Sequence, residues 1–205
     1  MNKETMIKDM TAKVTEVIDA KDAVLDIVEN IEDVVLEGKE KVAQLEAELK
    51  AKRDALDTFT DIGEARLAKA EINNLVEDIE LQIAVNAGKA KAMHTELEEK
   101  AEEFFKVHKS GIFLFRAVDN FFVANTSLLL LQDDKELMSG FASALNASFK
   151  AVRQILLDAE IVSQEDQNKS YKGYHLGQRE LVTELLTFDS KIRAYAQGLK
   201  LAGKL

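Results

Sequence analysis

An apolar repeat that keeps one heptad register from Ile7 to Phe59 is the feature that most constrains the fold. With Ile7 as position a, thirteen of the sixteen a and d positions are apolar, the exceptions being Lys21, Gly38 and Lys52. A 3.5-residue repeat sustained over so many turns predicts a coiled coil rather than an amphipathic helix on a globular core. The predicted seam of this first series comprises Ile7, Met10, Val14, Val17, Val24, Val28, Ile31, Val35, Val42, Leu45, Leu49 and Leu56.

The register breaks near residues 57–64, where Asp61 and Glu64 have the spacing of a helix N-cap and its third residue. A second apolar series follows, with Ile72, Val76, Ile79, Ile83 and Asn86 on its seam. Two arrangements satisfy both series: an antiparallel hairpin within one chain, or a stutter in a longer stalk that needs a partner chain. Asn86 falls on an a position, which leaves two interpretations open: a buried polar residue that fixes register and oligomeric state, or an Asn tolerated at a partly exposed seam.

Composition divides the chain into an acidic stalk and an aromatic-rich head. Residues 1–103 carry 14 Lys and Arg against 26 Asp and Glu, whereas residues 104–205 carry 13 against 11. Of the ten Phe and three Tyr, only Phe59 lies in the first part, and the whole chain lacks proline. Aliphatic residues without aromatics fill a narrow seam between helices but not a wide core. We therefore predict an all-α fold of long coiled-coil helices over 1–103, followed by a compact helical bundle over 104–205.

The head is predicted to contain three or four helices. Apolar residues cover nearly every face of 104–131, which indicates a central helix, and its polar residues Arg116, Asp119 and Asn120 are spaced for an internal ion pair. A turn at 132–135, a second helix, a loop at 163–177 and a last helix from Leu181 complete the expected order. The predicted head core comprises Phe105, Ile112, Phe115, Phe122, Phe141, Leu145, Phe149, Leu185 and Ile192.

Motifs for catalysis or cofactor binding do not occur in the sequence. There is no phosphate-binding glycine loop, no Glu-x-x-His pair for a di-metal bundle and no cysteine, so we expect no enzyme activity, cofactor or metal. The chemically richest segment lies in the predicted loop, where two tyrosines offer stacking faces next to His175 and Arg179. We interpret it as an ordered or protein-docking loop rather than a small-ligand site; its candidate residues are Tyr171, Tyr174, His175 and Arg179.

The net charge of the chain indicates which classes of binding partner are disfavoured. A formal charge of −10 and a pI near 4.9 disfavour nucleic acid and anionic lipid. The longest uncharged run, at 120–132, is too short to span a bilayer, so no stable membrane insertion is expected. No secretory signal is visible, which favours the cytoplasm or an assembled particle.

The leading functional hypothesis is a non-enzymatic assembly or interaction protein acting through coiled-coil self-association as a homo-oligomer. A bacterial or phage structural or scaffolding component is one concrete version of it. The alternative is an acidic regulatory adaptor or inhibitor that docks on a basic surface of another protein. A second alternative is a membrane-active protein that uses residues 104–131.

Overall fold

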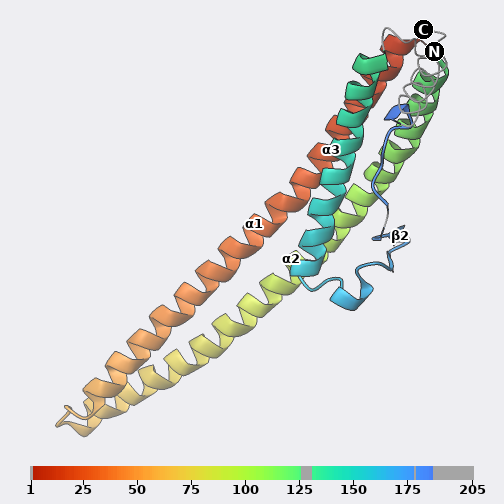
Figure 1. The fold of residues 1–205 in the computed structure, drawn as a ribbon. Helices are drawn as coiled ribbons and strands as arrows, with labels where there is room; N and C mark the ends of the chain where they lie inside the picture. The colour runs from red at the N-terminus through yellow and green to blue at the C-terminus, as the bar shows by residue number, and fades with distance from the viewer. Residues whose placement is uncertain (1, 126–130, 178, 187–205) are drawn as a thin grey trace, which may run out of the picture. The chain divides into compact units, whose positions relative to one another are not determined.

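The computed structural model describes residues 2–125, 131–177 and 179–186, which form an all-α fold, as the sequence predicts. Three long helices follow one another, α1 (Lys3–Leu56), α2 (Ile62–Asn125) and α3 (Leu131–Asp158) (Figure 1). A 3₁₀ turn (Gln164–Asp166) and two short strands, β1 (Ser170–Tyr171) and β2 (Tyr174–His175), come next. A chain without proline lacks the residue that most strongly interrupts helices, and this agrees with their length.

The chain groups into two compact units. Residues 26–98 form one, called the hairpin unit below, and residues 1–25 together with 99–205 form the other, called the head unit. This grouping differs from the sequence-based division at residue 103. The first 25 residues continue the heptad register of the stalk, but they pack with the head.

The hairpin unit consists of the adjoining parts of α1 and α2, which run antiparallel beside each other (Figure 1). The side-chain amide of Asn86 donates to the Gly38 carbonyl at 3.0 Å, and the Lys52 ammonium lies 2.7 Å from the Glu71 carboxylate. At the connection, the Asp61 carboxylate accepts the backbone N–H groups of Gly63 and Glu64, so it caps α2 as predicted. Of the two arrangements that the sequence allows, the structure has the hairpin within one chain.

Most predicted seam positions of the hairpin unit are shielded from solvent, but Val35 and Ile83 are not. Val35 is 37% exposed and Ile83 is 52% exposed, while their neighbours Val34 and Gln82 are half-buried. Gln82 turns inward because its amide donates to the Asn86 carboxamide oxygen at 2.8 Å, beside Gly38. The remaining seam positions of this unit are half-buried or buried: Val28, Ile31, Val42, Leu45, Leu49, Leu56, Ile72, Val76, Ile79 and Asn86.

Three helices of the head unit meet at Gly111 of α2. A Cβ atom at Gly111 would lie 3.2 Å from the Leu145 side chain of α3 and 3.3 Å from the Val17 side chain of α1. Eight predicted core residues are buried, and Ile192 lies outside the described residues. Of the predicted seam residues at the start of α1, Met10, Val14, Val17 and Val24 are buried here, and Ile7 is half-buried.

Two expectations about the head differ from the structure. The α2 segment is not covered on every face, because Phe113 is 62% exposed. Residues 132–135 form the first turn of α3, which begins at Leu131, rather than a turn before it. Most of the last predicted helix lies outside the described residues.

Candidate functional site

The predicted docking loop is folded against the head. A two-residue turn with positive φ at Lys172 and Gly173 connects β1 to β2, and Tyr171 pairs with Tyr174 across it. The Phe105 ring lies 5.3 Å from the Tyr174 ring, centroid to centroid, in a stacked arrangement, and 6.2 Å from the Tyr171 ring, edge to face. These tyrosine faces therefore contribute to packing. His175 and Arg179 are exposed, and the His175 Nδ1 accepts the Gly177 N–H at 3.0 Å.

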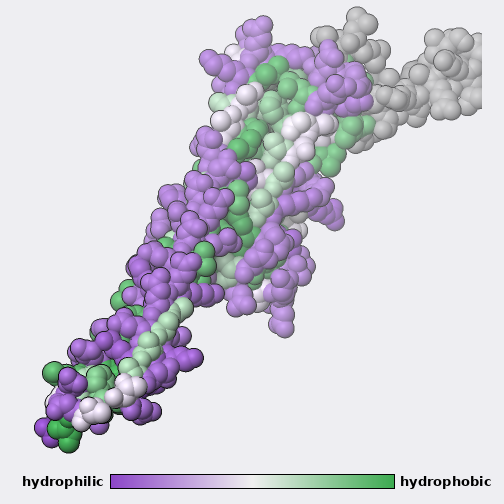
Figure 2. Space-filling model, turned by 90° about the vertical axis from the view of Figure 1, so that its left-hand side faces the viewer, coloured by the Kyte–Doolittle hydropathy of each residue, from purple (hydrophilic) through white to green (hydrophobic). Residues whose placement is uncertain are grey.

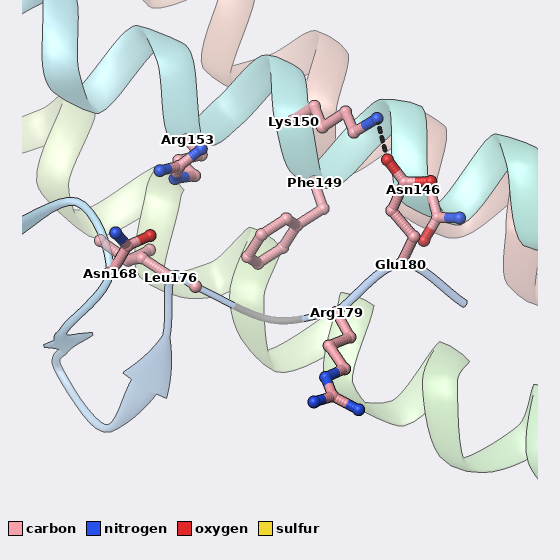
Figure 3. A pocket seen from close by; sticks show the side chains of 9 residues that line it. Asn146, Phe149, Lys150, Arg153, Asn168, Leu176, Arg179 and Glu180 are labelled. Carbon is pink, nitrogen blue, oxygen red and sulfur yellow. Dashed lines mark hydrogen bonds and ion pairs between the residues drawn. The ribbon is translucent and has the colours of Figure 1, made fainter. Parts of the chain in front are cut away.

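A cavity of about 190 Å³ lies between this loop and α3, and three cationic side chains line it. Lys150 is paired with Glu180, and the Arg153 guanidinium donates to the Gln167 carbonyl at 3.1 Å. Figure 3 shows the guanidinium of Arg179 pointing away from both. The Lys150 and Arg153 contacts tie the loop and the 180–186 segment to α3, so these two cations act in packing rather than as a preformed anion site.

Asp119 is a buried carboxylate whose partners come from far along the chain. It is 3% exposed, accepts a hydrogen bond from the Thr183 hydroxyl and accepts the Glu184 backbone N–H at 2.8 Å. These contacts, rather than the predicted neighbours on α2, satisfy Asp119. Its role is therefore to fasten the 183–186 segment to α2.

His108 is a buried titratable group of the head. Its Nε2–H donates to the Leu145 carbonyl at 3.1 Å, and its ring lies between those of Phe104 and Phe149, with centroids 5.5 and 5.2 Å away. Burial among aromatic rings disfavours the charged imidazolium and lowers the pKa of His108 to about 4. The imidazole is therefore a neutral packing element at neutral pH.

The least expected feature is a group of exposed apolar side chains in the hairpin unit. Among the described residues, eleven large hydrophobic side chains are exposed, and five of them lie close to the Gly38–Asn86 contact. Figure 2 shows hydrophobic side chains at the hairpin surface among hydrophilic ones. We call these five the apolar girdle: Val35, Leu36, Leu81, Ile83 and Val85. Their exposure makes them candidates for binding.

The girdle arises from the local geometry of the hairpin. Asn86 and Gln82 take inward positions beside Gly38, so the apolar residues next to them turn outward. Leu81 and Val85 share one face of α2, being four residues apart, and Ile83 lies on the opposite face. Of the five, only Val35 and Ile83 are on the predicted seam. For Leu81 and Val85 the available signal was the run of eight uncharged residues from Leu81 to Gly88, whereas Leu36 lies outside that run.

Acidic side chains flank the girdle on both sides. The antiparallel register set by Gly38 and Asn86 places residues 26–33 beside 91–98, and residues 42–49 beside 75–82. We call the acidic residues of the first level band A (Asp26, Glu29, Glu32, Asp33, Glu96 and Glu98) and those of the second band B (Glu46, Glu48, Glu77, Asp78 and Glu80). Band A has Lys91 as its one basic residue and band B has none. The girdle, whose side chains lie on more than one face of the hairpin, is therefore flanked by acidic residues at both ends along the helix axes.

Within the girdle itself the charges are compensated. The Lys41 ammonium lies 2.6 Å from the Glu37 carboxylate and, with Lys89 nearby, lowers the pKa of Glu37. Between the two bands, residues 34–41 and 83–90 carry three Lys against two Glu, so this stretch has no excess of negative charge. The negative character of the surface comes from bands A and B.

Among the described residues, no three metal-ligating side chains come together, and no helix combines the length and apolarity required to cross a membrane. Comparison with known protein families, curated protein sequences and solved structures gives no match. The girdle and its acidic bands are therefore the features from which function is inferred.

Proposed function

We propose that this chain is a non-enzymatic assembly protein that associates with further copies of itself through the apolar girdle of its hairpin unit. The observation that carries the proposal is that the hairpin pairs its seam within one chain, yet leaves five large apolar side chains exposed on either side of the Gly38–Asn86 contact and on more than one face. Exposed apolar clusters rimmed by polar groups are typical of protein–protein contacts. The sequence favoured self-association through a coiled-coil seam. Because that seam is paired within one chain, the proposed association uses the girdle instead.

The test compares three variants by sedimentation velocity over a wide concentration range. The girdle variant carries Leu36→Gln, Leu81→Gln and Ile83→Gln, all at positions more than half exposed, so its helix content should match that of the unmodified chain. The matched control is Leu67→Gln, which is 69% exposed and lies outside the girdle. We expect the unmodified chain and the control to associate alike and the girdle variant to stay monomeric. Unchanged association of the girdle variant would refute the proposal.

The second candidate function is an acidic adaptor or inhibitor that docks on a basic surface of another protein. The observation that favours it is the pair of acidic bands, within a hairpin unit that carries 18 Asp and Glu against 9 Lys and Arg. Charged bands of this kind steer association with a basic partner and make it sensitive to salt. A chain that stays monomeric at every concentration but binds basic proteins in a salt-dependent manner would favour the adaptor over the assembly protein.

A further inference from the structure

The two acidic bands restrict how copies of the chain can meet at the girdle. If the girdles of two hairpins packed against each other, bands A and B of one copy would face acidic bands of the other in either direction. Like charges brought together across an interface weaken association and act against that partner. The apolar girdle therefore favours a partner surface on which an apolar side chain is accompanied by cations.

The outer face of α2 in the head unit has this chemistry. Phe113 is 62% exposed, and Lys109 and Arg116, both exposed, lie four residues before it and three residues after it. On a helix, these spacings place the three side chains on one face, with the cations about 6 and 5 Å from the aromatic residue along the axis. We call Lys109, Phe113 and Arg116 the basic head patch.

Neighbouring residues leave the basic head patch accessible. Lys106, one turn earlier, is already 2.8 Å from the Glu102 carboxylate and is not counted in it. The Lys109 ammonium lies 5.9 Å from the centroid of the Tyr174 ring of the folded loop. The patch is thus a single large apolar side chain between two cations.

We propose that the basic head patch of one copy docks on the apolar girdle of another copy, with Phe113 against the girdle side chains of one face and Lys109 and Arg116 toward the acidic bands. The inference rests on the proposed self-association and specifies which surfaces meet. Asp33 lies two residues before Val35 and Glu80 one residue before Leu81, so carboxylates begin at both edges of the girdle. A contact between two different surfaces is heterologous, and it extends into chains or closed rings rather than stopping at a twofold dimer.

The test uses two variants that each lack one surface. The girdle variant is the triple glutamine substitution given above, and the head-patch variant carries Phe113→Gln and Arg116→Gln, again at exposed positions. Each variant alone has only one of the two surfaces, so we expect both to be monomers of 22.9 kDa. Mixed in equal amounts, they should form a one-to-one dimer that grows no further, because each molecule supplies the surface that the other lacks.

The outcomes separate this inference from the proposed function. If the unmodified chain is monomeric at all concentrations, the proposed self-association fails and the inference fails with it. If the unmodified chain associates and the head-patch variant associates equally well, the proposed function stands, but the basic head patch is not the partner of the girdle. If the unmodified chain associates and the mixed variants remain monomeric, the pairing of these two surfaces is likewise overturned. Circular dichroism of each variant verifies that it is folded.

The salt dependence of the mixed dimer tests the role of the cations. Raising sodium chloride from 0.05 to 0.5 M should weaken the one-to-one association about tenfold, since the cations and the acidic bands are exposed and screened. The Leu67→Gln control, mixed with unmodified chain, should show the same sensitivity as the unmodified chain alone. An affinity that is constant or rises with salt would overturn the proposed contact of Lys109 and Arg116 with bands A and B.

Discussion

At the scale of single residues, the contact between Gly38 and Asn86 determines the local geometry of the hairpin. A Cβ at Gly38 would come within 2.7 Å of the Asn86 carboxamide, so the close approach of the two helices requires glycine there. Asn86 is held from two sides, by the Gly38 carbonyl and by Gln82. Two seam residues close to this contact in sequence, Val35 and Ile83, are exposed and belong to the girdle.

Substitution of Gly38 tests this contact. Gly38→Ala should lower the free energy of unfolding by about 1–2 kcal/mol, because overpacking against Asn86 exceeds the gain in helix propensity. The control is Gly88→Ala, at a helical position with nothing within 4 Å of the added Cβ, which should raise the free energy of unfolding by about 1 kcal/mol. Urea unfolding followed by circular dichroism measures both.

A double variant completes this comparison. Adding Asn86→Ala to Gly38→Ala removes the atoms that clash. Asn86→Ala should therefore lower the free energy of unfolding less in the Gly38→Ala background than in the unmodified chain. Strictly additive effects of the two substitutions would show that the contact does not constrain the hairpin.

The pKa of His108 gives the head a pH-dependent stability. The folded pKa is about 4, against 6.5 for the free side chain, so the unfolded chain binds more protons between these values. Stability is therefore fully present above pH 6.5 and falls as the pH decreases, by about 3 kcal/mol at pH 4. The measurement is urea unfolding at pH 7.5, 6, 5 and 4, with His108→Gln as the reference that lacks this titration. Parallel curves for the two proteins would contradict burial of a neutral imidazole.

At the scale of elements, the helices and their pairing follow from pattern, whereas contacts between distant segments do not. The heptad register places Leu45, Leu49 and Ile79 on the inner side of the hairpin, where each is half-buried. The heptad register cannot reveal that α1 pairs with α2 of the same chain, because an apolar seam has the same sequence pattern whether it pairs within one chain or between two chains. The partners of Asp119 lie more than 60 residues away along the chain, beyond the reach of local spacing rules.

The candidate surface was predictable only in part. An apolar seam residue such as Ile83 appears buried in a helical pattern, and only the inward turn of Gln82 toward Asn86 exposes it. The predicted interaction site at Tyr171 and Tyr174 depends on side chains that pack on Phe105 instead. Sequence patterns report which residues are apolar, but the exposed subset depends on how two helices rotate against each other.

Substitution of Asp119 tests whether its carboxylate links α2 to the 183–186 segment. Asp119→Ala should lower the free energy of unfolding of the head by about 1–3 kcal/mol, since it leaves the Thr183 hydroxyl and the Glu184 N–H without their acceptor. Hydrogen exchange should rise at Glu184 and Leu185 in particular. The neighbouring exposed position provides the control, because Asn120→Ala should change neither. Equal protection of the 183–186 segment in both variants would rule out this role.

At the scale of the whole molecule, the two units carry surfaces of different chemistry. The hairpin unit carries an apolar girdle between acidic bands, and the head unit carries an aromatic residue between cations. Surfaces that differ in this way favour contacts between unlike faces over contacts between like faces. In the proposed association, each further copy would add through the same contact, as in an assembly component.

The most direct test of the central claim is the absolute mass of the unmodified chain in solution, measured by light scattering after size-exclusion chromatography over a concentration series. The account predicts a mass that rises above the 22.9 kDa of one chain with concentration and falls back toward it in the girdle variant. A mass of 22.9 kDa at every concentration would contradict self-association through the girdle.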